Sequence, residues 1–155
     1  MSFQVADVRE ELRAWFFDDY LPRGVAMING DDPAGADGFL PYWGRPLMLS
    51  ANGAARWLMT DDEVRGAVQR MNDQLVAAGY RDTPVPDSRI FVYNENGGAV
   101  EVIWSRRDGE GKEIQRLAVH FHMARIDGKW RYVAIQSRVT DPAIDRDSLD
   151  RAWAG

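Results

Sequence analysis

Two histidines one residue apart, His120 and His122, are the side chains whose type and spacing first suggest chemistry. If they lie on a strand they share a face, because side chains alternate along a strand. Such a pair holds a metal only when a third ligand converges on it. The chain has no cysteine and no other histidine, so an acid such as Glu101 would have to complete the site. We predict no metal here and interpret the pair as part of a sheet face used for dimerisation, with association sensitive to pH.

The facing of these histidines depends on the strand that carries them, which we expect at residues 114–126. The opposite face of that strand carries an apolar row, Leu117, Val119, Phe121 and Met123. The more apolar row should face the helices and the core, so the histidines should point outward. On the last strand the same count places Ile135 inward and Tyr132 outward, and a β-bulge would reverse such a count.

Two helices should cover the inner face. Apolar residues at helical spacing predict the first over residues 5–20, with Pro22 and Gly24 ending it. The second begins at a capping box, Thr60 to Glu63, and ends at Gly79. A short strand is expected at residues 45–50.

The second half of the chain changes to strand periodicity. Strands are expected at residues 89–93, 99–105, 114–126 and 129–139, joined by glycine-containing tight turns. Helices followed by antiparallel hairpins predict the α+β class. We expect residues 1–140 to form one domain and residues 141–155 a tail with a short surface helix.

Composition excludes several classes of function. The net charge of −5 argues against nucleic acid as a partner. Phosphate-binding glycine loops and the nucleophile elbow of esterases are absent, and we predict no cofactor. The first residues lack the pattern of a signal peptide and no segment reaches membrane-spanning length, so we expect a cytoplasmic protein with no membrane partner.

Three stretches carry a resemblance to a known superfamily: AWFFDDY, TDDEVRGAVQRMNDQL and ARIDGKWRYVAIQSR. Together with the order of elements over residues 5–139, they resemble the nuclear transport factor 2-like superfamily, which includes ketosteroid isomerase, scytalone dehydratase and SnoaL-like proteins. The resemblance implies a cone, in which a strongly curved antiparallel sheet wraps around the N-terminal helices. It also implies an apolar pocket at the wide end and a homodimer through the sheet.

The resemblance also suggests where chemistry would occur. Members of the dehydratase and isomerase branches transfer protons with an aspartate and tyrosines inside the cone, so the candidates here are Asp18 or Asp19 as base and Tyr20 as hydrogen-bond donor. The characteristic sheet aspartate of the isomerase has no counterpart in this chain. The candidate ligand contacts are aromatic, Trp15, Trp43, Trp57, Tyr93 and Phe121.

Two functions stay open at this point. The first is a cone that binds a small hydrophobic molecule in its apolar pocket. The alternative is a cofactor-free isomerase, dehydratase or cyclase acting on a flat hydrophobic substrate. Catalysis would require two polar groups that converge inside the cavity, whereas binding alone would not.

Overall fold

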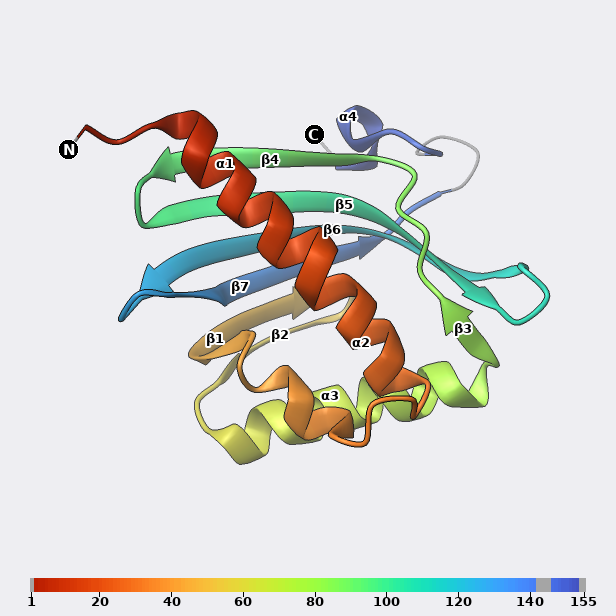
Figure 1. Ribbon diagram of the computed structural model, residues 1–155. Coiled ribbons are helices and arrows are strands. Elements are labelled where there is room, and N and C mark those ends of the chain that lie inside the picture. Colours follow the sequence, from red (N-terminus) through yellow and green to blue (C-terminus); the bar gives the residue numbers. More distant parts are fainter. Residues whose placement is uncertain (1, 142–145, 154–155) are drawn as a thin grey trace.

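Most of the helical residues precede the long antiparallel strands along the chain, in agreement with the predicted α+β class (Figure 1). A computed structural model describes residues 2–141 and 146–153, so the tail predicted at residues 141–155 lies partly outside the described residues. The helices are α1 (Val5–Arg13), α2 (Leu21–Ile28), α3 (Asp61–Ala77) and α4 (Leu149–Ala152). The strands are β1 (Trp43–Ala51), β2 (Ala54–Leu58), β3 (Tyr80–Asp82), β4 (Ser88–Asn94), β5 (Gly97–Asp108), β6 (Glu113–Ile126) and β7 (Lys129–Val139).

The first helix continues past the residues expected to end it. α1 passes into a π-helical segment, Ala14–Tyr20, and then into α2, so the prediction that Pro22 ends the helix is wrong. A proline in an α-helix removes a donor and crowds the carbonyl four residues earlier. Here the N–H of Leu21 donates to the carbonyl of Phe16, five residues back. This wider turn immediately before Pro22 lets the helix run on.

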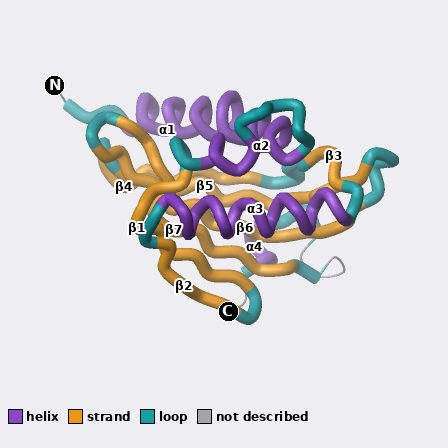
Figure 2. Tube along the Cα trace, turned by 90° about the horizontal axis from the view of Figure 1, so that it is seen from below, coloured by secondary structure: helices purple, strands orange, loops and turns teal. Residues whose placement is uncertain are grey.

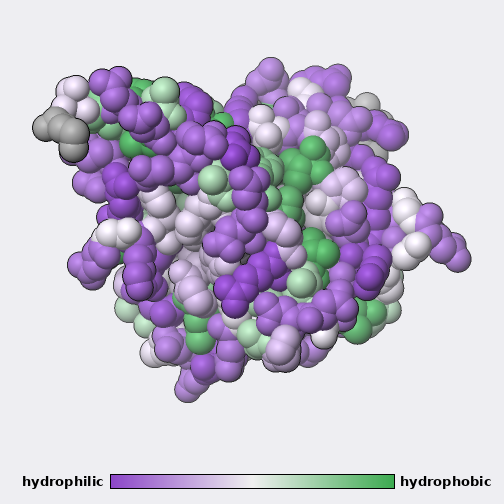
Figure 3. All heavy atoms as spheres, viewed as in Figure 1, coloured by the Kyte–Doolittle hydropathy of each residue, from purple (hydrophilic) through white to green (hydrophobic). Residues whose placement is uncertain are grey.

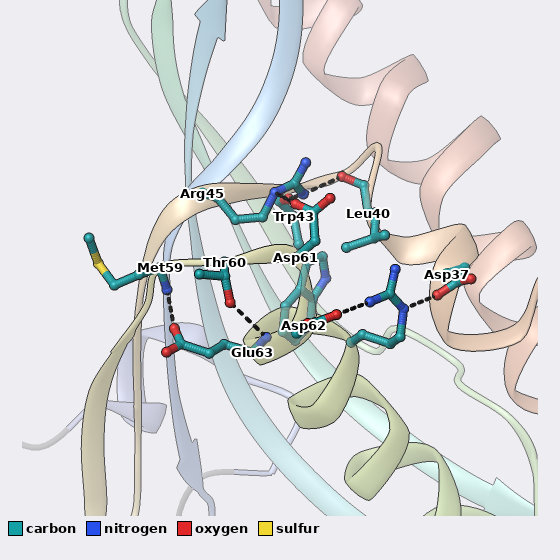
Figure 4. A network of polar contacts seen from close by, with 10 residues as sticks. Asp37, Leu40, Trp43, Arg45, Met59, Thr60, Asp61, Asp62 and Glu63 are labelled. Carbon is teal, nitrogen blue, oxygen red and sulfur yellow. Dashed lines mark hydrogen bonds and ion pairs between the residues drawn. The ribbon is translucent and has the colours of Figure 1, made fainter.

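The capping box of α3 is confirmed (Figure 4). The hydroxyl of Thr60 accepts a hydrogen bond from the N–H of Glu63 at 3.2 Å, and the carboxylate of Glu63 accepts one from the N–H of Met59. Arg45 on β1 adds an ion pair to Asp61 at 2.7 Å. The start of α3 is therefore fixed both by its own side chains and by the neighbouring strand.

The sheet has seven strands in the order β2, β1, β7, β6, β5, β3, with β4 also paired to β5. The predicted hairpins β5–β6 and β6–β7 are antiparallel, as expected. However, β1 pairs in parallel with β7, so the wholly antiparallel sheet of the prediction is corrected to a mixed one. The short strands β2 and β3 were not predicted.

A β-bulge in β7 changes which side chains face the core. Met123 of β6 is opposite Tyr132, but its neighbour His122 is opposite Ala134, so Val133 is the extra residue. Tyr132 and Ile135 consequently share the inner face, and Tyr132 has 0% of its surface exposed. Its predicted outward position is wrong because the bulge shifts the alternation by one residue.

The curved sheet carries the core on its inner face. Figure 2 shows α1 and α2 along one side of the sheet, while α3 crosses its lower end in Figure 1. Helix and sheet approach each other closely at Gly98, where a Cβ atom would lie 2.6 Å from the Cδ1 atom of Leu12 and 2.5 Å from the carbonyl oxygen of Phe91.

The outer face of the sheet is partly covered as well. Ile103 of β5 and Ala118 of β6 form a second, smaller apolar cluster with Leu149 and Ala152 of α4. The side chain of Asp87 accepts a hydrogen bond from the N–H of Leu149 at 2.9 Å, which fixes the start of this helix. Within the described part of the chain, no helix is long and apolar enough to span a membrane.

Candidate ligand-binding cavity

A cavity of about 210 Å³ lies between α2, α3 and the inner face of the sheet. Its walls are mainly apolar and come from α2, α3 and six of the strands, with Phe39 from the 3₁₀ helix Gly35–Phe39. The aromatic members of the wall are Tyr20, Phe39, Trp43, Tyr80, Trp104 and Phe121. On the face shown in Figure 3, the surface is mostly hydrophilic, with a band of hydrophobic residues near its middle and smaller hydrophobic patches elsewhere.

Tyr20 stands at the junction of the cavity and the aromatic core. Its hydroxyl accepts a hydrogen bond from the indole N–H of Trp43 at 3.3 Å. Its ring packs within 5.7 Å of the ring centre of Phe16 and 4.9 Å of that of Tyr132. Burial raises the pKa of Tyr20 to about 12, so the phenol stays protonated at neutral pH and can act there only as a donor or acceptor.

The charged groups on the cavity wall are both arginines. Arg106 of β5 and Arg56 of β2 line the cavity, whereas none of its described lining residues is an aspartate, a glutamate or a histidine. Arg106 follows Val102 and Trp104 on the inward row of β5, so the alternation of the strand places its guanidinium inside the cone. A chain with an overall negative charge thus presents positive charge to this cavity.

The candidate ligand contacts separate into two groups. Trp43 and Phe121 line the cavity. Trp15 packs behind it, with its ring centre 5.0 Å from that of Tyr132. Trp57 and Tyr93 are 61% and 52% exposed and lie outside the cavity, Tyr93 beside His122 on the outer face.

The candidate catalytic residues are not brought together. Tyr20 lines the cavity, but Asp18 is exposed and paired with Arg13 at 2.9 Å. The hydrogen bond from Arg13 lowers the pKa of Asp18, which weakens it as a base. Asp19 is also exposed and accepts a hydrogen bond from the hydroxyl of Tyr42 at 2.9 Å. The role of either aspartate as a base stays a hypothesis.

The histidines face outward, as the alternation of β6 predicts. The Nδ1 atom of His120 lies 2.7 Å from a carboxylate oxygen of Glu101, and Arg89 donates to the other oxygen at 2.6 Å. Burial alone would raise the pKa of Glu101, but the hydrogen bonds from His120 and Arg89 lower it below its usual value. No cluster of three or more metal-ligating side chains occurs within residues 2–141 and 146–153. Glu101 therefore forms an ion pair with Arg89 and shares a hydrogen bond with His120.

A family model described as NTF2-like protein (DUF6841) matches residues 9–140. The chain belongs to this NTF2-like family. No curated protein matches the sequence.

Solved structures share the NTF2-like fold at low sequence identity. An NTF2-like protein with a cystatin-like fold from Novosphingobium aromaticivorans is 16% identical, with a TM-score of 0.63 over 95% of this chain and 88% of that one. A protein of unknown function from Nostoc punctiforme is 18% identical, with a TM-score of 0.64 over 92% and 97%. A putative calcium/calmodulin-dependent protein kinase II association domain from Xanthomonas campestris is 13% identical, with a TM-score of 0.58 over 90% and 97%. These likenesses establish the cone fold.

Sequence reasoning missed the most polar part of this NTF2-like cavity. The predicted strand ended at residue 105, and Arg106 therefore stood outside it. Extending the inward row Val100, Val102, Trp104 by one more step would have found Arg106. Tyr80 had no comparable signal, because the short strand β3 has too few residues to show a period, and Thr83 lies just after that strand.

Proposed function

We propose that this NTF2-like domain binds a small, mainly apolar molecule in the cavity of its cone. The observation that carries the proposal is the cavity itself, with a volume of about 210 Å³ and aromatic walls. Binding sites for small molecules are concave, mainly apolar spaces with a few polar groups, and they are few in any one protein. A space with these walls is therefore a candidate binding site.

The volume limits the size of the ligand. An apolar cavity of about 150 Å³ inside a protein takes up benzene. A cavity of about 210 Å³ fits a single substituted ring or a branched aliphatic body of similar size. This supports a ligand smaller than the four fused rings of a steroid.

The alternative, proton-transfer catalysis, has less support. A general base that is unprotonated near neutral pH is normally a carboxylate or a histidine. The described lining residues supply tyrosines and arginines instead. Binding is therefore the function that the geometry favours, and a catalytic role would require one of the surface aspartates to reach the cavity.

A pair of matched variants tests the proposal. Toluene should raise the unfolding temperature of the wild-type chain. Ala67 lies on the cavity wall, so Ala67→Leu should fill the space and abolish that rise. Ala55 is exposed on β2 and outside the cavity, so Ala55→Leu should leave the rise unchanged. A wild-type chain that shows no response to toluene, or an Ala67→Leu variant that responds fully, would contradict the proposal.

A further inference from the structure

Arg106 is a guanidinium on the cavity wall with no carboxylate to balance it. Among the described residues its polar partners are the side-chain oxygen of Gln115, at 2.8 Å from Nη1, and the sulfur of Met71, at 3.7 Å from Nη2. Neither partner carries a charge. A guanidinium has five N–H donors, so most of its capacity is unused.

Three other arginines of limited exposure pair with carboxylates. Arg45, with 21% of its side chain exposed, pairs with Asp61 at 2.7 Å. Arg125, with 25% exposed, pairs with Glu11 at the same distance. Arg116, with 5% exposed, has two carboxylate partners, both at 2.8 Å. Arg106, on the cavity wall, has no such carboxylate partner among the described residues.

An unpaired, desolvated charge is costly to a folded protein. Burial lowers the pKa of Arg106, which reflects this cost, while the nearby Tyr80 and Tyr20 phenols act in the opposite direction. Structural charges in folded proteins are normally paired or solvated. A charge held at the wall of an apolar cavity without a partner is therefore poised to receive one from outside.

We propose that the ligand of this cavity is a small carboxylic acid with a single-ring apolar body, and that its carboxylate pairs with Arg106. The inference rests on the proposed function and names the chemical class of the ligand. The fork of a guanidinium matches the two oxygens of a carboxylate, so the pair can be bidentate. The ring would pack against the aromatic wall, which includes Trp43 and Trp104. Arg56, exposed on β2, adds a second positive charge to the lining.

Calorimetric titration with benzoate, benzamide and benzylamine tests the charge directly, in buffers free of carboxylate and phosphate. The three probes share a ring and differ in the charge they bring. A charge-assisted hydrogen bond is worth about 1.5–3 kcal/mol, so benzoate should bind about tenfold or more tightly than benzamide. Benzylamine should not bind.

Two variants assign the effect to one side chain. Arg106→Met removes the charge and keeps an unbranched apolar side chain. Because the charge-assisted hydrogen bond is lost, the affinities for benzoate and benzamide should come within about threefold of each other. Arg107 is the next residue on β5, its Nε donates to the hydroxyl of Ser105, and it does not line the cavity. Arg107→Met should therefore keep the wild-type preference.

Each failure has a distinct meaning. Equal affinity of the wild-type chain for benzoate and benzamide would overturn the carboxylate inference and leave the cavity proposal standing. Failure of benzoate, benzamide and toluene alike would overturn both. Tighter binding of phenylphosphonate than of benzoate would overturn the assignment to a carboxylate. Without ligand, Arg106→Met should unfold no earlier than the wild-type chain, and earlier unfolding would make the guanidinium a structural group and refute the proposal.

Discussion

The buried hydroxyl of Tyr132 gives a prediction that can be worked from the structure. Tyr132 is 0% exposed, and its hydroxyl has no hydrogen-bond partner among the described residues. An unsatisfied buried polar group costs about 1–3 kcal/mol. Tyr132→Phe removes only that group and keeps the ring, whose centre lies 4.7 Å from that of Phe121. We expect the free energy of unfolding to rise by about 1 kcal/mol, which corresponds to about 2–4 °C in unfolding temperature for a chain of this length.

Tyr20 provides the matched control. It lies in the same aromatic cluster, but its hydroxyl accepts a hydrogen bond from the buried indole of Trp43. Tyr20→Phe would leave that N–H without its partner and should lower stability by about 1 kcal/mol. The same chemical change should therefore have opposite signs at two neighbouring positions, measured by urea unfolding of both variants. A destabilised Tyr132→Phe variant would refute the reasoning, because it would mean that the hydroxyl of Tyr132 is hydrogen-bonded in solution.

Three further predictions concern packing, pH and assembly. Gly98→Ala would bring its Cβ atom to 2.5 Å from the carbonyl oxygen of Phe91, so overpacking should lower the free energy of unfolding by about 1–3 kcal/mol. Gly66→Ala within α3 should instead raise it by up to about 1 kcal/mol, because alanine favours the helix. Urea unfolding measures both changes. Burial raises the pKa of Tyr20 to about 12, so the unfolded chain releases this proton first as the pH rises above 10. The contribution of Tyr20 to the free energy of unfolding is therefore present below pH 10 and should fall by about 1 kcal/mol at pH 11. The Tyr20→Phe variant should not show this loss. A homodimer through the outer face of the sheet stays a proposal, and it should show about twice the chain mass of 17.6 kDa in light scattering. His122→Glu should shift this equilibrium toward the monomer. A wild-type chain that is monomeric at every concentration would contradict the proposal.

The parts of the fold that were predictable are those with strong local signals. Thr60 and Glu63 mark the start of α3 because the side chains of a capping box pair with backbone N–H groups that would otherwise lack a partner, and few other sequence patterns do this. The inward row of β6 is long enough for its period of two to be read directly. In both cases the residues that decide the structure lie within a few positions of each other.

The parts that were missed depend on distant or compensating structure. Pro22 continues a helix because the preceding turn widens, and no residue type announces such a turn. The bulge at Val133 exists only in relation to β6, so Tyr132 could not be placed from β7 alone. The parallel pairing of β1 with β7 joins residues far apart in the chain.

The candidate site was harder to predict than the fold. Among the predicted contacts, Trp43 and Phe121 line the cavity, because the curvature of the sheet brings them together. Trp57 is of the same residue type but lies on the edge strand β2, where it is exposed. The aromatic composition of the sequence therefore predicted an aromatic cavity wall, but the curvature of the sheet decides which aromatic residues form it.

The helix α4 makes β5 a strand with apolar cover on both faces. Val102 and Trp104 face the main core, while Ile103 between them is buried under Leu149 and Ala152. The backbone amides of this segment are therefore shielded from water on two sides and paired with β6 along its length. Amide hydrogens in such a position exchange only through the largest openings of a structure. Their exchange with deuterium should report the global free energy of unfolding, while the edge strand β2 should report local fraying.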